Sequence, residues 1–330
     1  MSLIIRVLIT GAAGFAAHHV VPALRAQGMC ELVGAAYSGE AAPGFDDTAR
    51  LDVTETDSVA RLIARIQPTH VLHLAGIAAP QTANQDPNLA WRVNTLGALA
   101  LGRAILAAAP ETILLHVGSG AAYGLSGHHR ARLDEEAPFA PGDEYGASKA
   151  AADLGLGALA RRGLKVVRLR PFNHTGPGQS VDYAIPAFAM QIAAIERGQR
   201  PPILTVGNLD AERDFCDVRD VAAAYARAAL MAWQDGIPSG RAYNLCSGRG
   251  VSMRAALDLL LSMSSARIEV RQDDARLRPA DIARLVGDPS RAQAELGWWA
   301  KIAFEDTLRT VLERFRHLPS PRAHDPSLTS

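Results

Sequence analysis

Short apolar runs alternate with longer stretches of helical character through the first half of the chain. The short runs are apolar throughout, as expected of strands buried on both faces. The longer stretches are rich in Ala, Leu and Arg, which favour helices. This alternation is typical of a parallel sheet covered by helices on both faces. The predicted strands are Arg6–Thr10, Glu31–Ala36, Val71–Ala75, Ile113–Gly118 and Lys165–Arg170, and the predicted helices are Ala16–Gln27, Asp57–Ile66, Asn88–Ala109 and Tyr145–Arg161.

The pattern changes after Pro171, where loops punctuated by Gly and Pro mix with short helices and indicate a second lobe. Within it, Arg213–Ala232 is predicted to be a strand and helix that return to the first domain. The expected fold is therefore α/β, a Rossmann-type doubly wound parallel sheet with a smaller C-terminal lobe. The expected division is 1–172 for the Rossmann domain with a return segment near 213–245, 173–212 and 246–317 for the lobe, and 318–330 for a disordered tail.

Composition narrows the function classes. Of 330 residues, 48% are hydrophobic and 21% charged, and 34 basic residues balance 34 acidic ones. This balance argues against nucleic acid or a membrane surface as the main partner. The chain runs directly into a predicted strand and has no apolar run of membrane-spanning length, so a cytoplasmic location is expected. Three cysteines, Cys30, Cys216 and Cys246, are odd in number and lack metal-ligand spacing, which predicts small core residues rather than a disulfide framework or a metal site.

A glycine-containing turn follows the first predicted strand and precedes the first predicted helix. Gly11 permits a tight turn, and Gly14 lets the backbone approach a pyrophosphate at the helix N-terminus. Ala17 takes the third small position, where a methyl group still allows close helix–strand packing. Such spacing also occurs in ordinary strand–helix turns, but its position after the first strand favours a dinucleotide site.

The second predicted strand ends without the carboxylate that usually binds a ribose 2′-hydroxyl. Tyr37 and Ser38 occupy that region, and no clamping arginine is obvious nearby. Without a carboxylate to repel a 2′-phosphate, NADPH is expected to bind at least as well as NADH. Asp52, in the run Leu51-Asp52-Val53, can either accept a hydrogen bond from adenine or cap a turn.

Tyr145 and Lys149 are four residues apart, on one face of a predicted helix. The ammonium group is expected to lower the pKa of the phenol, which suits Tyr145 to proton exchange with a carbonyl or hydroxyl oxygen. Ser119 follows a predicted strand and therefore lies at the carboxyl edge of the sheet, where ligands bind.

Together these elements resemble the extended short-chain dehydrogenase/reductase family from residue 4 to about residue 310. Ala17 and Gly118, which stand where a third glycine and a second serine are common, depart from the family pattern. The matching elements are Thr10–Ala17, Asp52-Val53, His73-Leu74-Ala75-Gly76, Val93-Asn94-Thr95, Ser119, Tyr145 with Lys149, Asn173, Arg213-Asp214-Phe215 and Tyr243-Asn244-Leu245.

The resemblance implies an enzyme with a Ser119, Tyr145 and Lys149 triad: Tyr145 as acid and base, Lys149 also holding the nicotinamide ribose, and Ser119 polarising the reacting oxygen. It implies that the first domain binds NADPH or NADH, and that Asn173, Arg213 and Arg278 contact the substrate together with Ser119. The implied cofactor contacts are Gly11, Ala13, Gly14, Phe15, Asp52, Val53, Leu74, Ala75, Gly76, Asn94, Tyr145 and Lys149.

The residue two positions after Ser119 narrows the reaction. Dehydratases of this family carry a glutamate there and fucose-type epimerase-reductases a cysteine, whereas this chain has Ala121. An alanine cannot take a proton from carbon, so hydride transfer alone is expected. The run from Pro171 to Gln179 resembles reductases of GDP-4-keto-6-deoxy-D-mannose, and its Asn-His pair is shared with GDP-mannose 4,6-dehydratases.

The leading hypothesis is therefore reduction of the 4-keto group of that GDP-sugar to GDP-D-rhamnose, with the C4 epimer, GDP-6-deoxy-D-talose, left open. A nucleotide-sugar 4-epimerase with tightly bound NAD⁺ also tolerates Ala121. A non-catalytic NAD(P)-binding sensor or scaffold on the same fold would not need the triad. The family pairs the helices predicted at Asn88–Ala109 and Tyr145–Arg161 across a two-fold axis, which implies a homodimer.

Overall fold

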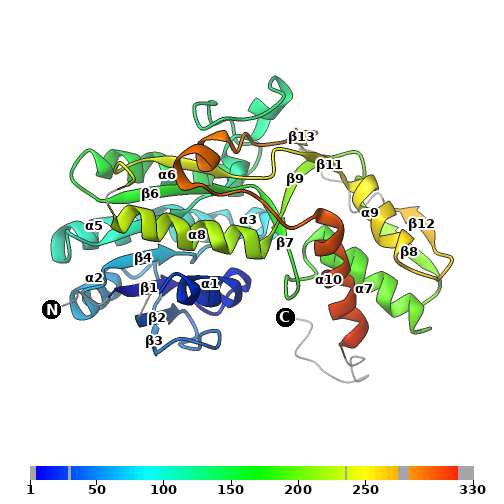
Figure 1. The fold of residues 1–330 in the computed structure, drawn as a ribbon, viewed down its shortest axis with the longest axis horizontal. Helices are drawn as coiled ribbons and strands as arrows, with labels where there is room; N and C mark the ends of the chain where they lie inside the picture. The colour runs from blue at the N-terminus through cyan, green and yellow to red at the C-terminus, as the bar shows by residue number, and fades with distance from the viewer. Residues whose placement is uncertain (1–4, 29–30, 235, 274–281, 319–330) are drawn as a thin grey trace.

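A seven-stranded parallel sheet forms the centre of the first domain in the computed structural model, which describes residues 5–28, 31–234, 236–273 and 282–318 (Figure 1). The five predicted strands are confirmed, each within two residues at either end. Two further short strands, β3 and β10, complete the two edges. In spatial order the strands are β10 (Ala242–Leu245), β6 (Val166–Pro171), β5 (Ile113–Val117), β4 (His70–His73), β1 (Arg6–Thr10), β2 (Glu31–Ala36) and β3 (Asp47–Arg50).

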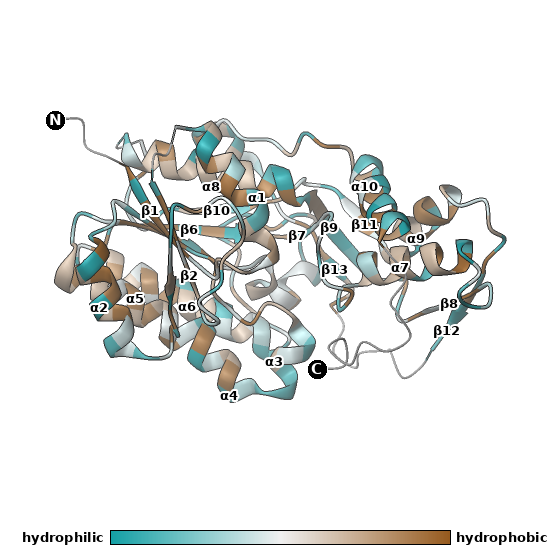
Figure 2. Ribbon diagram, turned by 90° about the horizontal axis from the view of Figure 1, so that it is seen from below, coloured by the Kyte–Doolittle hydropathy of each residue, from teal (hydrophilic) through white to brown (hydrophobic). Residues whose placement is uncertain are grey.

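Helices cover both faces of this sheet, as the apolar strands require. One face packs against α1 (Phe15–Ala26) and α8 (Val218–Trp233). The other packs against α2 (Thr56–Ile66), α5 (Ala98–Ala108) and α6 (Glu144–Ala160). Hydrophobic residues accordingly dominate the strands that lie between the two helical layers (Figure 2).

The long helix predicted from Asn88 is divided into three parts. After α3 (Pro80–Gln85), the chain forms α4 (Pro87–Ala90), a π-helical turn η1 (Trp91–Gly97) and then α5. Gly97 lies so close to Val53 that a Cβ atom on the glycine would lie 2.9 Å from Val53 Cγ2. The local widening of the helix therefore coincides with close packing against the loop that follows β3.

The second lobe has its own core between α7 (Ala184–Glu196), α9 (Met253–Ser262) and α10 (Phe304–His317). A two-stranded sheet of β8 (Ile203–Val206) and β12 (Glu269–Gln272) lies beside it. Between the lobe and the central sheet lies a small sheet (Figure 1) of β7 (Asn173–Thr175), β9 (Glu212–Asp217), β11 (Gly250–Ser252) and β13 (Arg284–Leu285). The remaining short helical turns are η2 (Gly120–Ala122), η3 (Gly124–His128) and η5 (Ala292–Leu296).

The return segment is only partly as predicted. Its helix, α8, does cover the central sheet, and β10 adds a strand to it. Its strand β9, however, pairs with β7, β11 and β13 in the small sheet rather than with the central one. The polar sequence of β9 explains this, because a strand at the centre of a parallel sheet is apolar on both faces.

Cys216 and Cys246 are free and buried, as predicted, whereas Cys30 lies outside the described residues. The expected tail also lies outside them, apart from Leu318. No helix of the described part of the chain is long and apolar enough to cross a membrane.

Candidate active site

The candidate site lies at the carboxyl edge of the central sheet. From β1 the chain continues to β2 on one side, and from β4 it continues to β5 on the other. Such a switch point opens a crevice in which α/β proteins bind ligands. β6 ends at Pro171 and β7 begins at Asn173, so this edge of the sheet faces the small sheet and the second lobe.

The glycine turn fits a pyrophosphate. Gly11 has a φ of +71°, and a Cβ atom there would lie 2.7 Å from the backbone nitrogen of Ala75. Gly14 is the N-cap of α1, and no side chain caps the first N–H groups of this helix. These N–H groups and the positive end of the helix dipole are therefore available to an anion. The turn holds the predicted contacts Gly11, Ala13, Gly14 and Phe15 together.

The backbone of the loop after β4 passes close to Asn94 and Lys149, an approach that glycine permits at position 76. A Cβ atom on Gly76 would lie 2.9 Å from Asn94 Oδ1 and 3.2 Å from Lys149 Nζ. Lys149 is 6% exposed and donates one hydrogen bond, to Val117 O at 3.1 Å, among the residues that the structure describes. An ammonium group has three donors, so Lys149 can bind the hydroxyl groups of a ribose. The loop also contains the predicted contacts Leu74 and Ala75.

The amide of Asn94 connects this loop to α6. Its Oδ1 accepts a hydrogen bond from Ile77 N at 2.8 Å, and its Nδ2 donates to Ser148 Oγ at 3.0 Å. Asn94 therefore fixes the loop relative to the helix that carries Tyr145 and Lys149. Its role as a cofactor contact remains a prediction.

Tyr145, Lys149 and Ser119 come together from two elements. Asp143 begins α6 by accepting a hydrogen bond from Gly146 N at 2.7 Å, which places Tyr145 in the first turn and Lys149 one turn later. Ser119 follows β5, accepts a hydrogen bond from Ala121 N at 3.1 Å, and lies near enough to Tyr145 for its hydroxyl to influence the pKa of the phenol. The three predicted catalytic groups thus meet at the carboxyl edge of the sheet.

The protonation states differ from the sequence-based expectation. Burial raises the pKa of Tyr145, the hydroxyl of Ser119 opposes this rise, and the charge of Asp143 adds to it. The prediction that Lys149 lowers the pKa of Tyr145 is therefore wrong for this structure, because burial raises this pKa and Lys149 is not among the groups that shift it. Burial also lowers the pKa of Lys149 to about 8. At neutral pH the phenol is protonated and can act as an acid.

A buried ion pair that the sequence did not indicate lies behind the triad. Asp153, one turn after Lys149 on α6, accepts hydrogen bonds from Arg170 Nε and Nη2, both at 2.9 Å. Arg170 Nη1 donates to the hydroxyl of Tyr123 at 2.7 Å, and Tyr123 lies four residues after Ser119. One guanidinium group therefore connects the helix of Tyr145 and Lys149 to the loop of Ser119.

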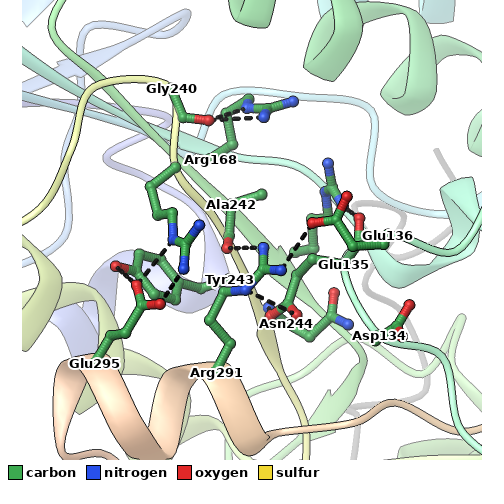
Figure 3. Close-up of polar contacts among 12 residues, drawn as sticks. Asp134, Glu135, Glu136, Arg168, Gly240, Ala242, Tyr243, Asn244, Arg291 and Glu295 are labelled. Atoms are coloured by element: carbon green, nitrogen blue, oxygen red, sulfur yellow. Dashed lines mark hydrogen bonds and ion pairs between the residues drawn. The ribbon is translucent and has the colours of Figure 1, made fainter.

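The network continues to the outer edge of the sheet, where Figure 3 shows Arg291 reaching between the strand of Ala242 to Asn244 and the acidic loop at Glu135. Tyr123 donates to Asn244 Oδ1 at 2.8 Å, and Asn244 N donates to Glu135 Oε1 at 2.7 Å. Arg291 lies 3.5 Å from Glu135 through Nε and 2.8 Å from Glu136 through Nη2. Each buried charge here has a partner of opposite sign, as a stable interior requires.

The second lobe borders the site from the other side. Asn173 is exposed at the start of β7, and Arg213 is partly buried on the neighbouring β9, where its Nη1 donates to Glu212 O at 3.0 Å. Tyr183 is the N-cap residue of α7, and burial together with the nearby Tyr145 raises its pKa. Nothing in the sequence pattern had singled out Tyr183. Arg278, a predicted substrate contact, lies outside the described residues.

Two further predicted contacts have structural partners. Phe15 stacks on His174 with ring centroids 6.4 Å apart, which joins the glycine turn to β7. Asp52 Oδ1 accepts hydrogen bonds from Thr54 N at 2.9 Å and Thr54 Oγ1 at 2.7 Å, so Asp52 caps a turn. The adenine contact of Asp52 remains a prediction, as does that of its neighbour Val53.

Comparison with known proteins agrees with this geometry. The chain matches the NAD dependent epimerase/dehydratase family over residues 7–246. A GDP-6-deoxy-D-mannose reductase of Pseudomonas aeruginosa is 36% identical over 264 residues, 80% of this chain and 85% of the relative. The structure of RMD from Pseudomonas aeruginosa complexed with NADPH has a TM-score of 0.79 at 31% identity and covers 94% of this chain and 98% of that one. UDP-glucose 4-epimerase of Thermus thermophilus, in complex with NAD, has a TM-score of 0.81 at 29% identity, with coverage of 94% and 99%.

The family match covers most of the chain, including the glycine turn, the three predicted catalytic groups and the seven-stranded sheet. The chain therefore belongs to the NAD dependent epimerase/dehydratase family, the extended short-chain dehydrogenases/reductases.

Proposed function

We propose that this enzyme uses NADPH to reduce the 4-keto group of GDP-4-keto-6-deoxy-D-mannose and forms GDP-D-rhamnose. The observation that carries the proposal is the combination of a protonated Tyr145 with Ala121. The first would supply the proton that a ketone reduction needs, and the second leaves no base at the position where the family's dehydratases carry one. A relative at 36% identity that is named a GDP-6-deoxy-D-mannose reductase supports the choice of sugar and nucleotide.

Each of the three predicted catalytic residues would have its own role in the reduction of the ketone. NADPH, held by the glycine turn and Lys149, would supply the hydride for the keto carbon and would leave as NADP⁺. Tyr145 donates its hydroxyl proton to the keto oxygen, so that C=O becomes CH–OH, and Ser119 holds that oxygen beside the phenol. Lys149 binds the ribose and keeps a positive charge near Tyr145 while the proton leaves.

We assign substrate binding to the second lobe, formed by residues 173–212 and 246–317, and cofactor binding to residues 1–172 with the return segment near 213–245. Asn173 of the lobe and Arg213 at the start of the return segment, on neighbouring strands of the small sheet, would contact the sugar and the diphosphate. A guanidinium fork suits a diphosphate because it donates two parallel hydrogen bonds. Arg278 is proposed as the second clamp on the basis of the family resemblance.

A nucleotide-sugar 4-epimerase is the alternative that the fold also supports, since an epimerase with bound NAD has a TM-score of 0.81. An epimerase oxidises and re-reduces the same carbon, and therefore consumes no cofactor. The net consumption of NADPH separates the two reactions. The triad argues against a non-catalytic role, because a sensor or scaffold would not need it.

The test couples the pure protein to a GDP-mannose 4,6-dehydratase. With GDP-mannose and both enzymes present, NADPH oxidation should match the keto sugar supplied, and nuclear magnetic resonance should identify the product as GDP-D-rhamnose rather than its C4 epimer. Alone, the protein should leave GDP-mannose unchanged. Conversion of GDP-mannose without the dehydratase would contradict the argument from Ala121. Failure to oxidise NADPH with the dehydratase present would favour the epimerase.

The proposal includes a cytoplasmic homodimer. Leu96 and Leu154 are 56% and 62% exposed, and they lie on η1 and α6, in the two regions that the family pairs across a two-fold axis. Burial of such side chains in a second copy would be favourable. Light scattering at micromolar concentration should give twice the chain mass, and Leu154→Glu should shift it toward the monomer. A monomeric wild type would contradict this assembly.

A further inference from the structure

The β2–β3 edge of the central sheet carries a cation that the sequence did not link to the cofactor. Arg50 is the last residue of β3, and the parallel register places it directly opposite Ala36, the last residue of β2. The position after β2 is where Rossmann domains distinguish a ribose 2′-hydroxyl from a 2′-phosphate. The register therefore places Arg50 beside this position on the neighbouring strand, fourteen residues later in the chain.

The turn after β2 folds back over Arg50. The carbonyl oxygen of Ala36 accepts hydrogen bonds from Gly39 N at 3.1 Å and from Leu51 N at 2.9 Å, so the turn and the end of β3 share one acceptor. Gly39 has a φ of +86°, and a Cβ atom there would lie 3.6 Å from Arg50 Cβ. Gly39 of this turn thus packs next to Arg50.

The pyrophosphate turn lies on the other side of β2. Ala12 N donates to Ala35 O at 3.1 Å, and Ala42 N donates to Ala12 O at 2.8 Å. A dinucleotide with its pyrophosphate at Gly11–Gly14 therefore places its adenosine ribose at the end of β2. The 2′-position of that ribose would then face the turn and Arg50.

The charge of Arg50 is available to a ligand. Arg50 is exposed, and its side chain forms no hydrogen bond or ion pair among the residues that the structure describes. The neighbouring carboxylates bind elsewhere: Asp46 pairs with Arg25 at 2.6 Å, and Asp52 accepts its hydrogen bonds from Thr54. Two further acids lie on this edge: Asp47, at the start of β3, accepts a hydrogen bond from Thr48 N at 2.8 Å, and Glu40 is exposed at the end of the turn.

We propose that Arg50, together with the Tyr37–Gly39 turn, binds the adenosine 2′-phosphate and so makes the enzyme select NADPH over NADH. A guanidinium group gives a dianionic phosphate charge-assisted hydrogen bonds, whereas it has no comparable partner in a ribose hydroxyl. The inference rests on the proposed use of NADPH but not on the identity of the sugar.

Binding without the sugar tests the proposal on the full-length protein. Affinities for NADPH, NADH, 2′,5′-ADP and 5′-AMP are measured by calorimetry for the wild type, Arg50→Gln and Arg50→Lys. Arg50→Gln should weaken NADPH and 2′,5′-ADP by about tenfold to a hundredfold, the range of one charged hydrogen-bonding partner, and leave NADH and 5′-AMP within about twofold. Arg50→Lys, which keeps the charge but not the fork, should fall in between.

Arg65→Gln is the matched control, because Arg65 is also exposed and lies away from this edge, on the last turn of α2. It removes the same charge and should change none of the four affinities. An equal loss of NADPH and NADH affinity in Arg50→Gln, or no loss of either, would overturn the proposal. Because no sugar is present, a failure of the proposed reaction would leave these affinities unchanged and would be recognised separately.

Discussion

Two arginines near the carboxyl ends of parallel strands in one sheet have opposite surroundings. Arg170 on β6 is 4% exposed, and its three nitrogens bind Asp153 and Tyr123. Arg50 on β3 is exposed and has no such partner among the described residues. An arginine whose guanidinium is paired inside the protein can position neighbouring residues, whereas one without internal partners can bind a ligand.

Burial makes the pairing of Arg170 necessary. A buried charge is stable only with excellent hydrogen-bond geometry, and removal of one partner leaves the other uncompensated. Arg170 also lies over the rings of Phe139 and Tyr123, with centroid distances of 4.7 and 5.5 Å. All of these contacts are internal to the protein, so this arginine has little capacity left for substrate or cofactor.

The largest expected effect comes from breaking the buried pair. Arg170→Met should lower the free energy of unfolding by about 3 kcal/mol or more, because Asp153 would keep only Arg168 as a cation. Denaturant unfolding measures the change. Lys165→Gln is the control, since Lys165 and Glu111 form an exposed pair and should contribute less than about 1 kcal/mol. Equal losses in the two variants would contradict the distinction between paired and exposed cations.

The second prediction concerns the acid that the Arg170 network positions. Tyr145→Phe removes the hydroxyl and keeps the ring, so kcat for keto-sugar reduction should fall by about a hundredfold, the typical contribution of a general acid. NADPH affinity, measured by calorimetry, should stay within about twofold. This is the reverse of Arg50→Gln, which should weaken NADPH binding without removing the proton donor. A Tyr145→Phe enzyme that keeps most of its kcat would identify another acid.

The third prediction is a pH dependence that arises from Lys149. Burial lowers its pKa to about 8, so the cation is present below that pH and is lost above it. The kcat/KM for NADPH should therefore fall by about tenfold per pH unit above pH 8. In Lys149→Arg the cation persists, so the decline should disappear even if the absolute rate is lower. A wild-type profile that stays flat to pH 10 would show that this charge is not required.

The smallest expected effect is that of Arg50→Gln on the stability of the protein. Arg50→Gln should change the free energy of unfolding by no more than about 0.5 kcal/mol, as is usual for an exposed residue without partners. The same denaturant titration used for Arg170→Met provides the measurement. A loss of several kcal/mol would mean that Arg50 has a structural role, and its effect on NADPH affinity would then have to be read from Arg50→Lys alone.

Local features allowed much of the fold to be predicted from the sequence. The strands from β1 to β6 that carry continuous apolar runs were identified because strands buried on both faces need such runs. The short, polar β3 has no such run, and it was missed although Arg50 lies on it. The strand of the return segment was recognised but was assigned to the wrong sheet, since strand pairing depends on partners far away in the chain.

In the candidate site, too, local features could be predicted from the sequence and long-range contacts could not. Gly11, Gly14, Tyr145 and Lys149 could be selected from the sequence because their spacing in a turn or on one helix face determines how they meet. Asp153 and Arg170 could not, because they are far apart in the chain and only the packing of α6 on β6 pairs them. The direction of the Tyr145 pKa was predicted wrongly for a related reason, since desolvation depends on every element that covers the phenol.

The sequence by itself thus determined the class of fold and the position of the candidate phosphate-binding turn and of the Tyr145–Lys149 pair, all of which follow from short-range periodicity and spacing. Only the tertiary structure decided which arginine is paired and which is available. Arg170 meets Asp153 through helix packing, and Arg50 meets the end of β2 through strand register. Both contacts join segments that are distant in sequence, and their energies depend on burial, which no local pattern specifies.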